Sequence, residues 1–313
     1  YPQPFPAFSV HMQTTPITSE DLANSVIAVP PMARDENLVF DREENEKIMR
    51  HIEAGGTSTL LYGGNANFYH IALSEYENIL GQLAELAGQD TLVVPAVGPA
   101  FGVMMDQADV VRETDYPTVM VLPQQGLTTS NGVVTGLRKF AERIGKPIVV
   151  YIKYGDFIDV EGAKQLVDDG LVSWIKYAIV REDPSDDPYL AELVEKVDPK
   201  IIVSGIGEQP VIDHLVGFGV NGFTAGCVCV RPDLSEELRE AVQAGNLERA
   251  REIQAIFRPL EDLRNGINPV RVLHEAVELT GIAKTGPHLP LLSGLTGAEK
   301  ALVKNAALNL LNT

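Results

Sequence analysis

Eight short runs of Val, Ile and Leu recur along the chain, and a segment with helical spacing of apolar residues follows most of them. The runs are apolar throughout rather than alternating, which is typical of strands covered on both faces, as strands of a parallel sheet are. Each run starts between 21 and 33 residues after the previous one, which leaves room for a helix between successive parallel strands. The runs occupy residues 26–29, 58–62, 91–97, 117–122, 147–152, 171–177, 199–204 and 220–225.

Eight β–α units within about 220 residues predict a (β/α)8 barrel, or TIM barrel, and therefore the α/β fold class. A doubly wound sheet rarely needs eight strands, and its G-x-G-x-x-G fingerprint is absent after the first run. We divide the chain into an N-terminal extension (1–24), the barrel (25–244) and a C-terminal helical appendix packed on the barrel (245–313). In the appendix we expect helices at 250–263, interrupted by Pro259, at 270–280 and at 296–311.

Composition and charge exclude several kinds of partner. The chain is 45% hydrophobic, which supplies a core and excludes a disordered protein. Its 25 Lys and Arg against 43 Asp and Glu give a formal charge of −18, which disfavours nucleic acid or an anionic membrane as a partner. Because the protein as a whole repels anions, an anionic small molecule could bind only at a site with local positive charge.

The cysteines and histidines indicate neither a disulfide scaffold nor a metal site. Cys227 and Cys229 are too few for such a scaffold, and the six histidines show no metal-ligand spacing. No run of 18 apolar residues occurs, and the chain does not start with a basic segment before an apolar one. We therefore expect a cytoplasmic protein in a reducing compartment, without a metal.

Lys176 ends the sixth apolar run, at the edge of the barrel where chemistry is expected. A lysine in an apolar strand must be paired or desolvated, and desolvation lowers the pKa of its ammonium group. The free amine that results is a nucleophile toward carbonyl carbons. The alternative is a lysine that reaches solvent at the barrel mouth or pairs with Glu182 or Asp183.

Tyr151 and Lys153 alternate onto one face at the end of the fifth run. A tyrosine facing an amine can relay protons during imine formation, and the alternative is an aromatic residue that only fills the barrel rim. Lys153 is a rival nucleophile, because spacing alone does not separate it from Lys176. Otherwise Lys153 adds positive charge to a substrate-binding site.

Small residues follow three other runs and are candidates for substrate binding. Gly64 and Asn65 lie in a loop after the second run, where backbone N–H groups could hold a carboxylate. Gly205 follows the seventh run and Thr224 ends the eighth. The alternative for each segment is an ordinary turn between a strand and a helix.

At these residues the chain resembles the dihydrodipicolinate synthase/N-acetylneuraminate lyase family of Schiff-base aldolases, from about Ser25 to Leu311. The resemblance rests most on the strand with Tyr151 and on Trp174-Ile175-Lys176, which is similar to the family's Gly-Ile/Phe-Lys strand. It implies that Lys176 forms a covalent imine, that no cofactor is needed, and that the chain forms a homotetramer. Further similar segments are 27–32, 61–67, 73–77, 204–205, 222–226 and 287–291.

Three departures from the family pattern bear on the substrate. Gly64 and Asn65 stand where the family has two threonines, and Pro123-Gln124-Gln125 lacks the tyrosines of Pro-Tyr-Tyr. Asp156 stands where an arginine would bind the carboxylate of aspartate semialdehyde. Because two anions in one cleft repel, we expect that the protein is not a true dihydrodipicolinate synthase.

The sequence therefore predicts a lyase of the aldolase type that acts on a 2-oxo acid such as pyruvate and on an aldehyde. Lys176 forms the imine, Tyr151 shuttles protons, and Gly64 with Asn65 holds the carboxylate of the 2-oxo acid. Two alternatives stay open: a dehydratase or hydratase-aldolase of keto-sugar acids that uses the same lysine, and a barrel that binds a 2-oxo acid without turnover.

Overall fold

The computed structural model describes residues 12–313, so residues 1–11 of the expected N-terminal extension lie outside the described residues. Residues 19–24 of that extension form helix α1 (Ser19–Asn24), whose buried Leu22 lies against the start of the last strand. A Cβ atom on Gly222 would come within 2.3 Å of the Leu22 carbonyl oxygen, so the glycine permits this close contact. Helix α1 thereby packs at the amino-terminal end of the barrel.

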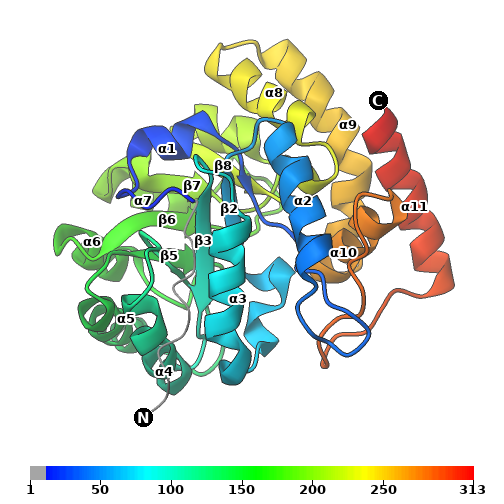
Figure 1. Ribbon diagram of the computed structural model, residues 1–313. Coiled ribbons are helices and arrows are strands. Elements are labelled where there is room, and N and C mark those ends of the chain that lie inside the picture. Colours follow the sequence, from blue (N-terminus) through cyan, green and yellow to red (C-terminus); the bar gives the residue numbers. More distant parts are fainter. Residues whose placement is uncertain (1–11) are drawn as a thin grey trace.

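Eight parallel strands form a closed barrel in which each strand pairs with its neighbours in chain order, as the spacing of the runs predicts (Figure 1). Most strand residues are fully buried, which confirms that both faces are covered. Several strands are shorter than their runs; the run at 199–204, for example, begins with a 3-10 turn at Pro199, since proline has no N–H to donate to a ladder. The strands are β1 (Ile27–Ala28), β2 (Thr59–Tyr62), β3 (Leu92–Val97), β4 (Met120–Val121), β5 (Ile148–Ile152), β6 (Val172–Tyr177), β7 (Ile202–Ser204) and β8 (Gly222–Ala225).

Helices on the outside of the barrel follow most strands, and side chains at their first residues fix where they begin. Asp41, Thr129 and Asp159 each accept a hydrogen bond from a backbone N–H in the first turn of the helix that follows. Between β7 and β8 the helical segment ends in a short π-helical turn, Asp213–Gly217. The barrel helices are α2 (Arg42–Ala54), α3 (Leu73–Leu86), α4 (Phe101–Arg112), α5 (Ser130–Ile144), α6 (Val160–Asp168), α7 (Pro188–Lys196) and α8 (Pro232–Gln243).

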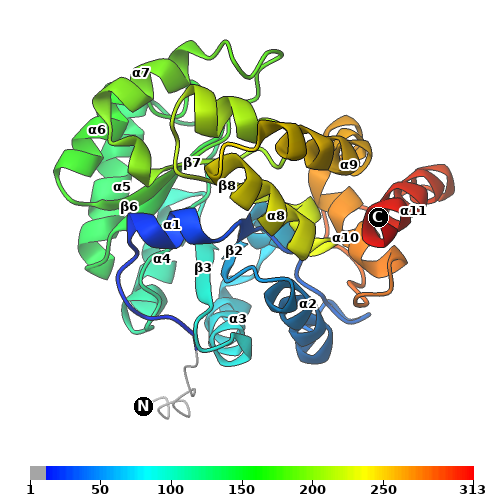
Figure 2. The ribbon, with the colours of Figure 1, turned by 90° about the horizontal axis from the view of Figure 1, so that it is seen from above.

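Three further helices, α9 (Leu247–Gly266), α10 (Pro269–Leu279) and α11 (Gly297–Asn312), lie together on one side of the barrel beside α8 (Figures 1 and 2). The prediction that Pro259 interrupts the first of them is wrong, because α9 continues through it. Pro259 is exposed, while Phe257 and Leu260 on either side of it are buried. Burial on both sides offsets the roughly 3 kcal/mol that proline costs inside a helix.

In the part of the chain that the structure describes, no helix combines the length and the apolar character needed to cross a bilayer. The longest helix, α9, instead carries charged residues along its exposed side, among them Arg251, Glu252 and Arg258.

Candidate active site

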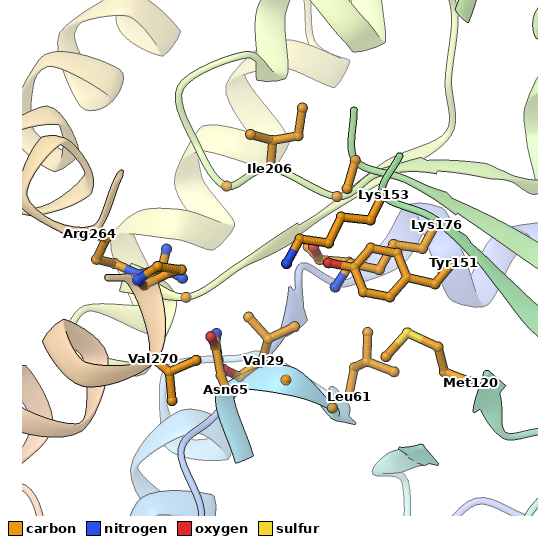
Figure 3. Close-up of a pocket in the computed structure, with 18 of the residues that line it drawn as sticks. Val29, Leu61, Asn65, Met120, Tyr151, Lys153, Lys176, Ile206, Arg264 and Val270 are labelled. Carbon is orange, nitrogen blue, oxygen red and sulfur yellow. Dashed lines mark hydrogen bonds between the residues drawn. The ribbon is translucent and has the colours of Figure 1, made fainter. Parts of the chain in front are cut away.

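A cavity of about 320 Å³ opens at the carboxyl ends of the strands and is closed on one side by α9 and α10 (Figure 3). The residues that the sequence singled out come from five different loops or strands, and all of them line this one cavity. They are Gly64, Asn65, Tyr151, Lys153, Lys176, Gly205 and Thr224.

Lys176 occupies the middle of the barrel wall, on β6 between Tyr151 of β5 and Val203 of β7. Its side chain is only 6% exposed and points into the cavity. Within residues 12–313 its amine makes no ion pair or hydrogen bond, and Asp183 instead accepts from Ser185 Oγ at 2.7 Å, so the alternative of a pair with Glu182 or Asp183 is wrong. Gly205 makes room for this side chain, since a Cβ there would lie 2.9 Å from Lys176 Cγ.

The surroundings of Lys176 favour its neutral form. Burial, together with the positive charges of Lys153 and Arg264, lowers the pKa of its amine from 10.5 to about 7. A low-dielectric environment disfavours an isolated charge, and nearby cations disfavour a second one. Near neutral pH a large fraction of Lys176 is therefore a free amine, the form that attacks a carbonyl carbon.

Tyr151 and Lys153 differ sharply in their environment. The Lys176 Nζ atom lies 4.5 Å from the centre of the Tyr151 ring, and burial raises the pKa of the Tyr151 phenol, so the hydroxyl keeps its proton at neutral pH. Lys153 is exposed just beyond the end of β5, with its Nζ 5.6 Å from the ring of Tyr154. Burial thus separates the two rival lysines that spacing could not.

The loop after β2 turns sharply through a 3-10 turn, Gly64–Ala66, and through Asn67 in the left-handed conformation (φ 59°). Within the described residues, the backbone N–H groups of Gly64 and Asn65 make no bond to another backbone group. Donors of this kind at the wall of a cavity can bind a carboxylate.

Helix α10 fixes this loop from the outside. His274 Nε2 lies 3.0 Å from the Asn65 carbonyl oxygen, and burial lowers the pKa of His274 to about 3, so its ring is neutral and donates through that nitrogen. The Asn65 side-chain amide donates to the Val29 carbonyl at 3.1 Å. The side chain of Asn65, which stands where the family has a threonine, is therefore engaged in holding the loop.

Two residues that the sequence analysis missed also line the cavity. Arg264 enters it from α9, and Tyr69 lies after the Gly64–Ala66 turn with its hydroxyl donating to the Pro123 carbonyl at 3.1 Å. Arg264 lies 88 residues beyond Lys176, in a helix that the sequence analysis assigned to the appendix. The only feature of the sequence that could have drawn attention to Arg264 was its position three residues after Glu261, which allows the two side chains to meet on one helix face.

Asp156 does not support the argument that was built on it. It is exposed and does not line the cavity, so its carboxylate would not oppose an anionic substrate there. The expectation that the protein is not a true dihydrodipicolinate synthase loses this support.

One group of residues has the spacing of a metal site within residues 12–313. Glu208, Cys227 and Glu261 place ligand atoms within 4.8 Å of one another in the interior. Burial raises the pKa of Glu208 well above its ordinary value, and the neighbouring Glu261 raises it further. The Arg264 guanidinium lies 3.7 Å from Glu261, so this cluster already contains a cation.

The fold and the lysine-bearing cavity define a Schiff-base type of aldolase, and comparison with known proteins agrees. The chain belongs to the dihydrodipicolinate synthetase family, whose model matches residues 23–307. It is an enzyme of that family, a lyase of the class I aldolase type, and the family works through a Schiff-base lysine without a cofactor.

Individual relatives are distant. The 4-hydroxy-tetrahydrodipicolinate synthase of Methanopyrus kandleri is 25% identical over 271 residues, covering 84% of this chain and 88% of the relative. The dihydrodipicolinate synthase of Bacillus clausii has the same fold, with a TM-score of 0.81 at 23% identity over 92% of this chain and 97% of that chain. A prophage protein of the dihydrodipicolinic acid synthase family from E. coli, solved in complex with pyruvate, matches with a TM-score of 0.79 at 16% identity, covering 91% and 98%.

Proposed function

We propose that this protein forms a covalent imine between Lys176 and pyruvate or a closely related 2-oxo acid, and uses it to make or break a carbon–carbon bond. The observation that carries the proposal is the buried amine of Lys176, which has no ion pair in the described part of the chain, a pKa near 7 and an open cavity beside it. The pyruvate complex of a relative with the same fold supports the choice of ligand.

The proposed reaction begins when the neutral Lys176 amine attacks the ketone carbon of the 2-oxo acid. The carbinolamine that forms loses water to give a protonated imine, which withdraws electrons from the adjacent carbon. Loss of a proton from that carbon gives an enamine, whose carbon attacks the carbonyl carbon of an aldehyde. Hydrolysis of the new imine releases the product and regenerates the amine, and the reverse sequence cleaves the bond.

The surrounding groups have defined roles in this proposal. Tyr151, whose ring lies against the Lys176 amine, transfers protons to and from the carbinolamine oxygen. The N–H groups of Gly64 and Asn65 bind the carboxylate of the 2-oxo acid, and Lys153 adds positive charge at the mouth. Gly205 and Thr224 form the wall against which the substrate packs. The homotetramer implied by the family resemblance stays a prediction.

Borohydride reduction in the presence of pyruvate tests the proposal. The hydride reduces an imine to a stable secondary amine, so we expect a covalent adduct on Lys176 that peptide mass spectrometry locates. Samples without pyruvate or without borohydride serve as controls. An unmodified protein, or an adduct on Lys153 instead, would contradict the assignment.

Replacement of Lys153 by glutamine is expected to move the acid side of the pH–rate profile to higher pH. The Lys153 charge disfavours the ammonium form of Lys176, so its removal raises the pKa of Lys176 and demands a higher pH for the same fraction of free amine. The measurement is kcat/KM against pH for the wild type and Lys153→Gln. Lys139→Gln, which replaces an exposed lysine on α5, is the matched control and should leave the profile unchanged. A shift to lower pH would show that Lys153 does not act on Lys176 through its charge.

A further inference from the structure

Arg264 is a buried cation whose position the proposed reaction does not explain. It is 8% exposed and reaches the cavity from α9, on the side opposite Lys176 (Figure 3). Its Nε atom has no hydrogen-bond partner within residues 12–313. The carboxylate nearest to it, Glu261, lies 3.7 Å away, beyond hydrogen-bond length. The donors of the guanidinium are therefore largely unused, although burying such a group without partners is costly.

Two glycines of the barrel loops make the space that Arg264 and Glu261 occupy. A Cβ on Gly226 would lie 2.4 Å from Arg264 Cζ, and a Cβ on Gly207 would lie 2.1 Å from Glu261 Oε1. Both glycines also line the cavity. The loops after β7 and β8 thus form a cradle for the guanidinium at the wall of the cavity.

Two carboxyl groups, those of Glu208 and Glu261, lie behind this cradle. Glu261 is near enough to attract the guanidinium of Arg264 but too far to accept a hydrogen bond from it. Glu208 and Glu261 place carboxyl oxygens within 4.8 Å of each other, and burial together with the neighbouring Glu261 raises the pKa of Glu208 well above its ordinary value. Glu261 accepts a hydrogen bond from the Gln209 N–H at 2.8 Å, and Glu208 accepts one from Ser235 Oγ at 3.2 Å. The Glu261 carboxyl group, held by the bond from Gln209, therefore faces the guanidinium at 3.7 Å.

The charges at the cavity wall point to a ligand with two negative groups. Lys153, Lys176 and Arg264 line it, and no Asp or Glu of the described residues does. The N–H groups of Gly64 and Asn65 already supply a site for the carboxylate of a 2-oxo acid on another part of the wall. The guanidinium of Arg264 is then left over, and its planar set of N–H donors is suited to bind a second carboxylate.

We propose that Arg264 binds a second carboxylate on the substrate, remote from the carbon that forms the imine. The inference rests on the proposed function and makes it more specific. The aldehyde that adds to the enamine carries a carboxylate, and the product, or the substrate of the cleavage direction, is a 2-oxo diacid.

Equilibrium binding of matched acids tests this inference without any need for turnover. The probes are 2-oxoadipate and 2-oxohexanoate, which have the same number of carbon atoms and differ in the second carboxylate. By calorimetry we expect the wild type to prefer the diacid by about tenfold or more, as a charge-assisted pair of hydrogen bonds implies. Arg264→Gln should reduce that preference to about threefold or less and change the affinity for pyruvate by less than about threefold.

Matched variants separate the role of the guanidinium from a general change in the protein. Arg258→Gln removes an exposed arginine from the same helix and should keep the preference for the diacid. Gly226→Ala keeps the charge but displaces the guanidinium, and it should lower the preference as Arg264→Gln does. Circular dichroism checks that each variant is folded, and Arg264→Lys provides a second variant that keeps a buried cation.

The outcomes test the role of Arg264 independently of whether Lys176 forms an imine. A wild type without a preference for the diacid, or a preference that survives in both Arg264→Gln and Gly226→Ala, overturns the role of Arg264. An equal loss of pyruvate affinity would assign Arg264 to the carboxylate of the 2-oxo acid itself, which also overturns it. Failure to trap an adduct with borohydride would instead refute the imine at Lys176, while the calorimetric preference would still report on Arg264.

Discussion

Lys176→Met is expected to abolish turnover and, at the same time, to make the protein more stable. Without the amine no imine forms, so kcat should fall by more than about a thousandfold. The folded protein holds the Lys176 pKa at about 7, against 10.5 for an unperturbed lysine, which costs on the order of 4 kcal/mol of folding free energy at neutral pH. Methionine fills a similar volume without that cost, so we expect the free energy of unfolding to rise by roughly 2–4 kcal/mol at pH 7.

The pH dependence of this stability gain follows from the direction of the pKa shift. A lysine whose pKa is lowered by folding destabilises the protein fully below the folded pKa, near 7, because there the folded state must bury an ammonium group or release its proton. The cost declines as the pH rises toward 10.5, where the unfolded chain also loses the proton. Urea unfolding of the wild type and Lys176→Met between pH 6 and pH 10 measures the difference, which should shrink as the pH rises.

Lys153→Met is the matched control for this prediction. Lys153 is exposed, so its replacement should change the unfolding free energy by no more than about 0.5 kcal/mol. A Lys176→Met protein that is less stable than the wild type at pH 7 would mean that the amine makes favourable contacts. That result would contradict the desolvated, neutral lysine on which the proposed chemistry depends.

Tyr151→Phe is expected to lower kcat by about a hundredfold or more while leaving the affinity for pyruvate within about threefold of the wild type. Phenylalanine keeps the ring that packs against the Lys176 amine and removes only the hydroxyl. The loss would then report proton transfer during formation and hydrolysis of the imine. Stopped reactions with borohydride at successive times measure the rate of imine formation directly.

The neighbouring Tyr154 provides the control for the hydroxyl. It lies half-buried beyond the end of β5 and does not line the cavity, so Tyr154→Phe should leave the rate of imine formation nearly unchanged. If Tyr151→Phe forms the imine at the rate of the wild type, Tyr151 has no role in proton transfer and is an aromatic residue that only fills the barrel rim.

The barrel and much of the site could be predicted because both follow from local patterns and one topological rule. Apolar runs mark strands buried on both faces, and the carboxyl ends of parallel strands meet at one rim. Lys176, Tyr151 and Gly64 therefore had to lie near one another once eight strands were counted, and the cavity contains all three. It was also predictable that Lys176 is either paired or desolvated, and its burial in the structure decided between the two.

Other features depended on distances that no local pattern encodes. The helical spacing around Pro259 did not show that packing would keep α9 continuous, and Asp156 was placed in the cleft by analogy although its side chain is exposed. His274 supports the loop at Asn65 from more than 200 residues away in the chain.

The sequence by itself thus determined the strands and the end of the barrel at which chemistry is expected, because burial of an apolar run is a property of that segment alone. Only the tertiary structure decided how α9 docks between the loops at Gly207 and Gly226 and brings Arg264 to the cavity. The direction in which a long helix packs depends on the summed fit of many distant side chains and on the space that those glycines leave. That packing sets the charge at the far wall of the cavity.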